Sequence, residues 1–525
     1  MRKIFLSAFS AFILGLCVYH QADGVKKEQE SFTVKLNIVD AETGERIGGI
    51  VRVYREGDDS PIVLTGLYDR LKGLKQTATL AGWHVVPAAG GSTSLPKGKG
   101  RIEAVSGLET VLAREDFDFS KNMPEEVTLK VRTIFRPEER QLIAGNTHLH
   151  LMKITQEDAD EYLKLIPAAD RLKVMFISYL ERFKVDEEYI TNRYAIGELK
   201  QFNATGVLFN NGEEHRHNFE GFGQGYGHVM FLNINQLVKP VSIGPGISGA
   251  GNDERPLKPG IEEARMQGGT IIWCHNTNGF EKTANALAGR LDALNVFDGS
   301  RTGSFEDGYY RYLNIGLRLP LSTGTDWFMY DFARVYANVP GKLSVPAWLE
   351  AVKAGRCQAT NGPLLSLTAD GKDIGHVENL DQPKNVNVEL MAIGRHDFQS
   401  LQLIHNGKVI QTAPAKAKDG VYTARIQREV RIEEPAWFTA RIDTEHKNEL
   451  DKQLFAHTSP IYVDFKGKRV FDVETARVLL REMEEARDAI KARGKFNADA
   501  ARDQLLAIYD ETAKELKEKI NKRGK

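Results

Sequence analysis

Cysteine is scarce in this chain, and its scarcity excludes one class of fold. Three cysteines occur among 525 residues, and only Cys274 and Cys357 lie beyond the apolar N-terminal segment. Two cysteines are too few for the disulfide framework of a small secreted scaffold. Cys274 ends an apolar run, and we interpret it as a small buried hydrophobic residue rather than as a metal ligand.

Net charge is nearly absent as well. The chain carries 70 Lys and Arg residues against 71 Asp and Glu residues, so nothing indicates a nucleic-acid backbone as its partner. Beyond the N-terminus no apolar run is long enough to predict a membrane span. Apolar residues make up 42% of the chain and charged residues 27%, which is typical of a folded globular protein. The length predicts three to four structural units.

Residues 1–22 are expected to be a signal peptide. A basic start precedes the short apolar stretch at residues 4–18, and polar residues follow. The mature protein is therefore expected to be secreted or periplasmic. Lipid attachment at Cys17 is the less favoured alternative, because the bulky Leu16 stands where lipoprotein signals carry a small residue.

Three further regions differ from the middle of the chain. Residues 31–135 and 367–468 alternate apolar and polar side chains with a period of two, which predicts a β-sandwich in each. Residues 469–525 are rich in Ala, Glu, Lys and Arg and predict a helical hairpin with Asp472 as a helix cap. The apolar side of this hairpin is expected to contact either the neighbouring domain or a second copy of the chain, which would make a homo-oligomer.

Residues 136–366 alternate short apolar runs with amphipathic segments. This order predicts an α/β domain of parallel β/α units, closed into a distorted barrel that covers both faces of its sheet. The predicted strands lie at residues 173–178, 270–275, 292–297 and 319–324. The predicted helices lie at residues 156–171, 259–267, 306–314 and 344–354.

His148 and His150 are the most informative pair in the central region. In an extended strand, residues two apart point to the same face, so both imidazoles can reach one cation. A half-buried strand with two incidental histidines is the alternative. Further groups of ligand type recur where predicted strands begin or end, and in β/α barrels such positions converge on one mouth. They are Glu214 with its neighbour Glu213, His228, His275 and Asp326.

Neutral imidazoles combined with one or two carboxylates suit zinc, manganese or iron. An open coordination position would let the ion acidify a water molecule. We therefore expect one or two divalent ions, zinc first, held by the following six residues: His148, His150, Glu214, His228, His275 and Asp326.

The order of these motifs resembles the polymerase and histidinol phosphatase (PHP) superfamily, in particular its CehA/McbA branch of secreted or periplasmic metallohydrolases. The resemblance covers roughly residues 145–363. It rests on Gly145-Asn146-Thr147-His148-Leu149-His150, Gly212-Glu213-Glu214, Gly227-His228, Trp273-Cys274-His275-Asn276, Gly324-Thr325-Asp326-Trp327, Ala354-Gly355-Arg356 and Thr360-Asn361-Gly362-Pro363. It implies a PHP-like distorted β/α barrel, here flanked by the two β-sandwiches and the helical hairpin.

The same resemblance assigns the six residues named above to the metal-ligand positions of the family. Asn146 stands where many relatives carry Asp. Two other motifs of the family, Thr-Asp-His after the second strand and the final Asp-x-His, are missing here, which favours one or two ions over three. Replacements for the missing ligands are expected at His215, His217 or Glu181.

The sequence thus predicts a hydrolase that directs an activated water at an ester, carbamate or amide bond of a small-molecule or polymer-derived substrate. Asp326 is the expected ligand that also accepts a proton. His217 is the expected leaving-group acid, with a further ligand or a solvated loop residue as alternatives. We expect residues 218–226 to line the pocket and residues 245–256 to act as a lid.

Two other functions stay open at this point. A phosphoesterase would need cationic side chains at the mouth, and Arg216, Arg290 and Arg334 are available. A non-catalytic protein of the cell surface, binding glycans on a degenerate barrel, is the other alternative.

Overall fold

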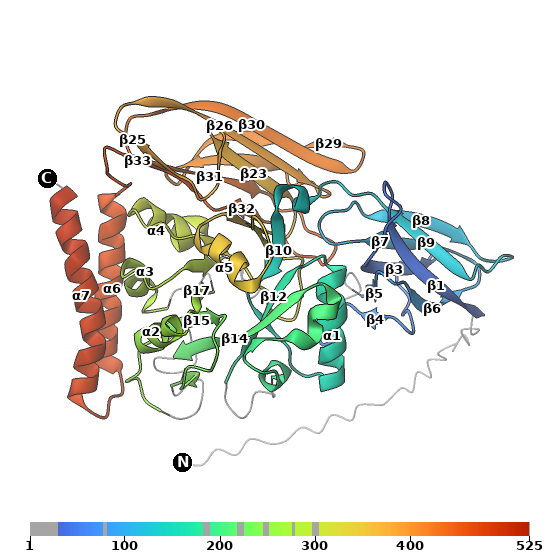
Figure 1. The fold of residues 1–525 in the computed structure, drawn as a ribbon, viewed down its shortest axis with the longest axis horizontal. Coiled ribbons are helices and arrows are strands. Elements are labelled where there is room, and N and C mark those ends of the chain that lie inside the picture. The colour runs from blue at the N-terminus through green and yellow to red at the C-terminus, as the bar shows by residue number, and fades with distance from the viewer. Residues whose placement is uncertain are drawn as a thin grey trace, which may run out of the picture.

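The computed structural model describes residues 30–76, 81–181, 189–217, 225–244, 251–275, 279–296 and 304–523. Figure 1 shows strands of the N-terminal region at one end of the molecule, a pair of long helices at the opposite end, and a mixed α/β region between them. The chain is thus a strand-rich α/β protein. The predicted signal peptide, Cys17 included, lies outside the described residues.

The N-terminal region folds into two facing sheets. β1 pairs with β2, β6 and β9 in one sheet, and the other has the order β4-β5-β3-β7-β8. Alternate residues such as Val34, Leu36 and Val51 are buried between them, as period-two alternation requires. The strands are β1 (Ser31–Asp40), β2 (Arg46–Ile47), β3 (Gly49–Arg55), β4 (Tyr68–Asp69), β5 (His84–Val86), β6 (Gly91–Pro96), β7 (Lys99–Val105), β8 (Ala113–Asp118) and β9 (Glu126–Val131).

The central region is built on a large curled sheet. Its strands and the small pair β11–β20 are β10 (Leu142–Asn146), β11 (Leu149–His150), β12 (Val174–Tyr179), β13 (Gly197–Glu198), β14 (Leu208–His217), β15 (Gly227–Leu232), β16 (Ser242–Ile243), β17 (Thr270–Cys274), β18 (Ala293–Asn295), β19 (Leu321–Ser322), β20 (Asp326–Trp327), β21 (Arg334–Asn338) and β22 (Cys357–Thr360). Its helices are α1 (Gln156–Ala169), α2 (Lys258–Met266), α3 (Lys282–Leu287), α4 (Arg311–Asn314) and α5 (Val345–Lys353). Short 3-10 and π turns are η1 (Pro137–Arg140), η2 (Ile190–Arg193), η3 (Lys200–Thr205) and η4 (Glu306–Tyr310).

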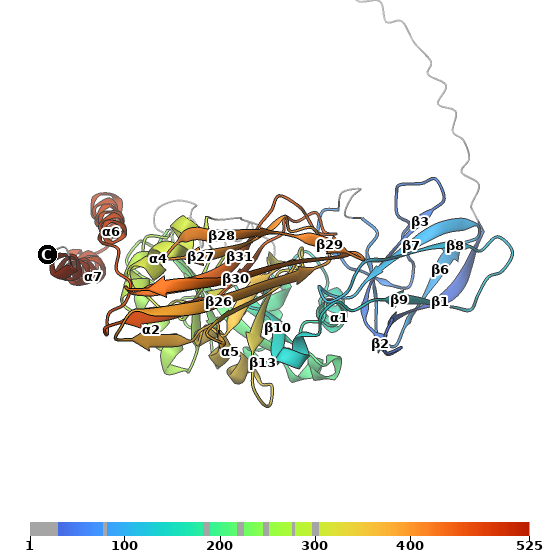
Figure 2. The same cartoon turned by 90° about the horizontal axis from the view of Figure 1, so that it is seen from above.

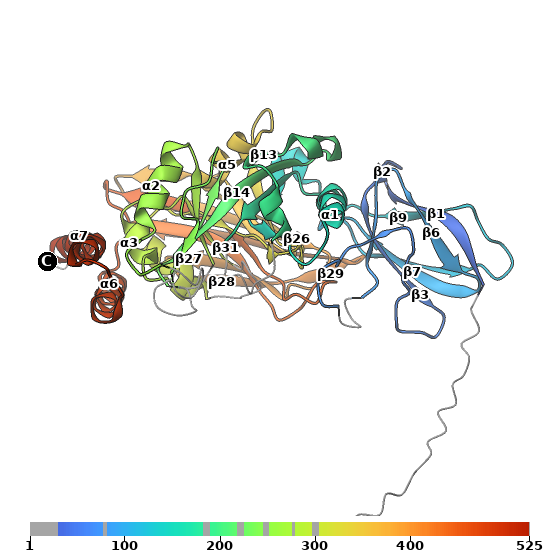
Figure 3. The ribbon, with the colours of Figure 1, turned by 90° about the horizontal axis from the view of Figure 1, so that it is seen from below.

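The predicted parallel β/α order holds for only part of this sheet. β10, β12 and β14 run parallel, as do β17, β18 and β19. β15, however, runs antiparallel to both β14 and β17, with Glu213 opposite Phe231. Because β15 pairs antiparallel with the strand that precedes it in sequence, no helical crossover is needed at this point. The consequence for the site is that Glu214 and His228 lie on neighbouring strands. Seen from below, β14 and α2 lie in front of the C-terminal strands (Figure 3).

The C-terminal strands lie across the central region, as Figure 2 shows from above. They are β23 (Leu364–Ala369), β24 (Lys372–Asp373), β25 (Val377–Leu380), β26 (Lys384–Gly394), β27 (Ser400–His405), β28 (Lys408–Pro414), β29 (Lys416–Lys418), β30 (Val421–Ile432), β31 (Ala436–Asp443), β32 (Ala456–Thr458) and β33 (Ile461–Phe465). One sheet has the order β24-β23-β26-β30-β29 and packs on the remaining strands. β32 pairs with β22, so the central sheet continues into this region, and the predicted boundary after residue 366 falls inside β23.

His457 lies at this junction and gives a prediction for the pH dependence of folding. Its Nε2 faces the Tyr310 hydroxyl at 2.8 Å, and burial lowers its pKa from 6.5 to about 3. Below pH 6.5 the imidazole of His457 is protonated in the unfolded state but stays neutral in the folded state. The free energy of unfolding therefore falls as the pH decreases toward 3. We expect His457→Gln, which can still accept from Tyr310, to reduce this slope by up to about 1.4 kcal/mol per pH unit. Denaturant unfolding at a series of pH values measures the slope, and equal slopes would contradict the prediction.

The chain ends in the predicted helical hairpin, α6 (Val473–Arg493) and α7 (Asp499–Arg523). Asp472 caps α6 by accepting from the Thr475 amide at 2.7 Å. The apolar sides of both helices are buried in the same core cluster as residues of the central region. The hairpin therefore packs on its neighbouring domain, and this part of its apolar surface is not free to contact a second copy of the chain. Among the described residues, no helix combines the length and apolar character that a membrane crossing requires.

Candidate metal centre

The six predicted ligands come together in the structure. The segments that carry them are the turn after β10, the strands β11, β14, β15 and β20, and the residue that follows β17. Five of the side chains are buried and the sixth is 12% exposed. They form two sets that share one residue. The first group is His148, His150, Glu214 and Asp326, and the second group is Glu214, His228 and His275.

The spacing within the first group suits a small cation. His150 Nε2 lies 2.9 Å from both His148 Nε2 and Glu214 Oε2. Asp326 Oδ1 lies 3.5 Å from His148 Nε2 and 3.7 Å from His150 Nε2. Two ligands of a tetrahedral zinc ion stand about 3.3 Å apart, given bonds of about 2.0–2.1 Å. The four side chains therefore surround a space of the size that one such ion needs.

The second group adjoins the first through a carboxylate that both share. Glu214 directs Oε2 to the first group, while its Oε1 lies 3.1 Å from His228 Nδ1 and 3.9 Å from His275 Nε2. Asp326 Oδ2 lies 4.0 Å from His275 Nδ1, the ring nitrogen that does not face Glu214, so Asp326 belongs to the first group alone. Glu214 thus presents one oxygen to each group, so that the two groups could hold a pair of adjacent cations.

The ring of His150 is held in a defined orientation. Its Nδ1 lies 2.9 Å from the carbonyl oxygen of Ser178, which can only accept, so Nδ1 carries the proton. In the neutral ring Nε2 then has a lone pair, and this lone pair faces His148 Nε2 and Glu214 Oε2. These atoms repel one another unless a cation or an additional proton lies among them. A backbone carbonyl that fixes the far nitrogen is a regular feature of metal-bound histidine.

Burial acts differently on the three ionisable groups at the centre. Burial alone raises the pKa of Glu214, but the surrounding imidazoles of His148, His150 and His228 outweigh it and lower the pKa well below 4.5. Burial lowers the pKa of His228 to about 3, so this imidazole is neutral at pH 7. Burial raises the pKa of Asp326. The centre therefore offers a neutral imidazole at His228 and an ionised carboxylate at Glu214, the protonation states in which these side chains bind metal.

Four buried atoms of Glu214, His228 and Asp326 make no hydrogen bond within the described part of the chain: Glu214 Oε1, His228 Nδ1, His228 Nε2 and Asp326 Oδ1. A buried polar atom without a partner costs about 1–3 kcal/mol, so such atoms mark places where a ligand is missing. Four imidazoles with two carboxylates form a donor set that divalent zinc, manganese or iron accepts. The residues present thus fit a divalent transition-metal ion.

Backbone and amide contacts fix the position of His148. Asn146 Oδ1 accepts from the His148 amide at 3.0 Å, and Asn146 Nδ2 donates to Thr325 Oγ1 at 3.0 Å. The His148 carbonyl in turn accepts from the amides of Thr325 and Asp326, at 3.0 and 2.9 Å. Asn146 therefore holds the segments that carry His148 and Asp326 together and does not belong to either group.

Gly324 allows the close approach of these two segments and provides a prediction. A Cβ atom at this position would lie 2.4 Å from His148 Cβ and 2.8 Å from the His148 amide nitrogen. No side-chain rotation can relieve a contact with backbone, so Gly324→Ala is expected to displace His148. We expect metal affinity to fall about 10- to 100-fold, as when other groups that orient a ligand are changed. Competition with a chromophoric chelator measures this affinity.

Gly48→Ala is the matched control for this variant, because its added Cβ would meet only atoms at ordinary contact distance, 3.5 Å and beyond. It is expected to bind metal as the wild type does. Equal metal affinity in the Gly324 variant would mean that the position of His148 does not limit binding.

His217, His215 and Glu181, the expected replacement ligands, do not belong to either group of the centre. Side chains of β14 alternate, so Glu214 faces the centre while His215 and His217 face the opposite side. His217 Nδ1 lies 2.8 Å from the Arg255 carbonyl and its Nε2 3.3 Å from the Pro240 carbonyl, and burial lowers its pKa to about 3. This placement removes the basis for His217 as the leaving-group acid. His215 contacts Glu213 at 2.7 Å, and Glu181 accepts from a tyrosine.

Two aromatic residues beside the centre were not identified from the sequence. The rings of Tyr189 and Trp327 are stacked with centroids 5.4 Å apart, and each lies beside His150, at 5.6 and 5.3 Å. They form an apolar wall next to the first group. Trp327 follows Asp326 directly, so its position beside the centre could have been expected from the sequence. Tyr189 comes from a separate segment with no ligand motif. Residues 218–224 of the predicted pocket loop, which spans residues 218–226, and residues 245–250 of the predicted lid lie outside the described residues.

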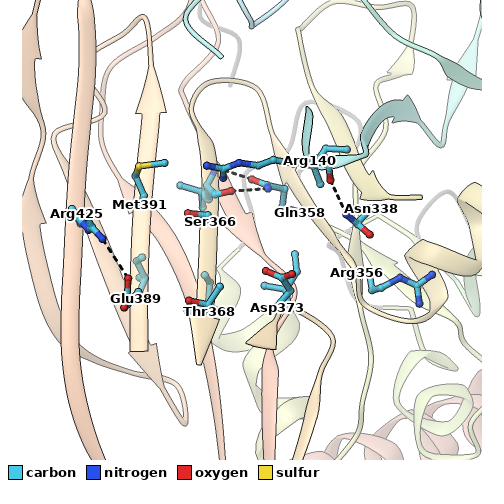
Figure 4. Close-up of a pocket in the computed structure, with 15 residues that line it drawn as sticks. Arg140, Asn338, Arg356, Gln358, Ser366, Thr368, Asp373, Glu389, Met391 and Arg425 are labelled. Atoms are coloured by element: carbon cyan, nitrogen blue, oxygen red, sulfur yellow. Dashed lines mark hydrogen bonds and ion pairs between the residues drawn. The ribbon is translucent and has the colours of Figure 1, made fainter. Parts of the chain in front are cut away.

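A groove of about 660 Å³ lies elsewhere, between the central sheet and the outer face of the C-terminal sheet (Figure 4). Arg140, Arg356, Asp373 and Arg425 are among its lining residues, and Arg425 is paired with Glu389 at 3.4 Å. None of the six centre residues lines this groove. The buried ligand groups, and not this cavity, are therefore the basis for a functional assignment.

Comparison of the chain with family models, with curated proteins and with solved structures finds no match. The resemblance to the PHP superfamily therefore stays a prediction. The metal centre rests on its own geometry.

Proposed function

We propose that this protein is a metal-dependent hydrolase whose centre takes two divalent ions, zinc first, with manganese or iron as alternatives. The observation that carries the proposal is the sharing of Glu214 between two adjacent ligand groups. The order of the ligands along a curled α/β sheet supports a PHP-like barrel of the CehA/McbA type. Export by the N-terminal segment is part of the same proposal.

The first group would hold one ion with four side chains, and the second group would hold the other with three. Three protein ligands leave a coordination position open, as in catalytic zinc sites, whereas four are typical of a closed site. Bound ions would acidify a water molecule and polarise the bond to be cleaved.

The residues of the chain contribute orientation and proton transfer. Ser178 holds the His150 ring through Nδ1, and Asn146 holds the His148 backbone. Asp326 is the proposed proton acceptor, because its carboxylate lies among the ligands of the first group, where an activated water would be held. Tyr189 and Trp327 exclude water from one side of the first group. The leaving-group acid is not assigned to His217, since that ring contacts backbone carbonyls on the far side of β14.

Elemental analysis of the purified protein tests the proposal. We expect about two equivalents of a divalent metal, loss of hydrolysis after chelation, and its return when zinc, manganese or iron is added. A panel of 4-nitrophenyl carboxylic esters, a carbamate, an anilide and 4-nitrophenyl phosphate identifies the bond type. A metal-free protein in which added metal restores no hydrolysis would contradict the proposal and favour the glycan-binding alternative.

A phosphoesterase is the second candidate, and one observation favours it. Arg216 carries a buried positive charge whose Nη1 lies 3.9 Å from Glu214 Oε1, beside the second group. Within the panel, preference for the phosphate over every carboxylic ester would select this candidate.

A further inference from the structure

Arg216 lies on the same face of β14 as Glu214, two residues further along the strand. In the antiparallel pair with β15 it stands opposite His228, a member of the second group. Its side chain is 8% exposed. A guanidinium is therefore buried directly beside the metal ligands.

At least one donor of this guanidinium, Nε, is buried without a hydrogen-bond partner among the described residues. The contact of the guanidinium with Glu214 Oε1 at 3.9 Å is too long for a hydrogen bond. A guanidinium has five N–H donors and no acceptor, and burying it unpaired is costly. An anionic oxygen at this position would satisfy it.

The charge of the centre leads to the same conclusion. Glu214 and Asp326 with Arg216 leave one net negative charge, since the imidazoles are counted as neutral. One divalent ion would make the centre positive, and a second would add two more positive charges. A buried centre with excess positive charge attracts anions and holds them strongly.

Arg216 lies beside the centre, whereas the other two arginines predicted as candidates for anion binding, Arg290 and Arg334, do not. Arg334 is fully buried and donates to the carbonyls of Asp170 and Phe332. Arg290 contacts Asn285 at 3.3 Å. The hydrogen bonds and ion pairs of Arg334 and Arg290 within the described part of the chain involve none of the six centre residues.

We propose that Arg216 binds an anionic oxygen of the substrate, so that substrates with a carboxylate or phosphate beside the scissile bond are preferred over neutral ones. This inference rests on the proposed function and extends it to the class of substrate. The guanidinium fork matches either anion through two parallel hydrogen bonds.

Calorimetric titration of the zinc-loaded protein with inorganic phosphate and with acetate tests this role and distinguishes the two anions. We expect Arg216→Gln to weaken binding of the preferred anion about 10- to 100-fold, as for hydrogen bonds to charged groups, and Arg216→Lys to weaken it less. In parallel, the ratio of kcat/KM for mono-4-nitrophenyl succinate to that for neutral 4-nitrophenyl acetate should fall in Arg216→Gln. Arg425→Gln, at a site 70% exposed and outside the centre, is the matched control.

Metal content, measured on every variant, separates this inference from the proposed function. Wild-type protein without metal would contradict the proposed function itself. Full metal content in Arg216→Gln with unchanged anion affinity would overturn the role of Arg216 alone. Loss of metal in both Arg216→Gln and Arg216→Lys would also overturn it, because Arg216 would then serve to hold Glu214.

Discussion

Replacing His148 and His150 together by alanine is expected to remove the bound metal and to abolish hydrolysis. Both imidazoles direct Nε2 into the first group, and only Glu214 and Asp326 would remain there. The loss of an outer partner of a ligand already costs about 10- to 100-fold in affinity or activity, so the loss of two ligands should cost more. Elemental analysis and the preferred substrate of the hydrolysis panel measure the two effects.

His376→Ala combined with His446→Ala is the matched control, because both histidines lie in the C-terminal region and neither belongs to the two groups. The control is expected to keep metal and turnover. Hydrolysis at the wild-type rate in the His148 and His150 double variant would exclude a catalytic role for this centre.

Several of the candidate ligands could be expected to lie close together because they come near the ends of predicted strands. His148 and His275 each come soon after a buried strand, and Asp326 follows the short strand β19. Strands that run parallel in one sheet bring such positions to the same edge. These three candidates therefore meet although residues 148 and 326 are far apart in the chain, whereas Glu214 and His228 come together through the antiparallel pairing of β14 with β15.

The placement of His217 could also have been derived from the sequence. Residues 214 and 217 differ by an odd number, so on one extended strand they point to opposite faces. Arg216, by contrast, shares the face of Glu214 by the same rule. The alternation within β14 decides which polar side chains of Glu214-His215-Arg216-His217 can reach the centre.

Other features had no local pattern that could predict them. Every residue of β15 is buried, and a continuous apolar run does not reveal whether a strand is parallel or antiparallel. The pairing of β22 with β32 joins residues almost one hundred positions apart, and it carries the central sheet across the predicted domain boundary. The contact of Tyr189 with His150 likewise depends on tertiary structure alone.

Glu214→Gln is expected to remove metal from both groups at once. The substitution keeps the size of the side chain but removes the negative charge that Oε1 and Oε2 present to the two sides. An amide also directs an N–H group at one of the sides, where it repels a cation. Elemental analysis should therefore give less than about one metal ion per chain, and hydrolysis should fall with the metal.

His228→Ala is the informative partner of this variant, because it removes a ligand of the second group and leaves the four side chains of the first intact. A site with four protein ligands is complete for zinc, so about one ion per chain should remain, without the open position needed for hydrolysis. One ion in the wild type and one ion in His228→Ala would show that the second group binds no metal. Two ions in the wild type, about one in His228→Ala and less than one in Glu214→Gln is the combined result expected if the shared carboxylate serves two ions.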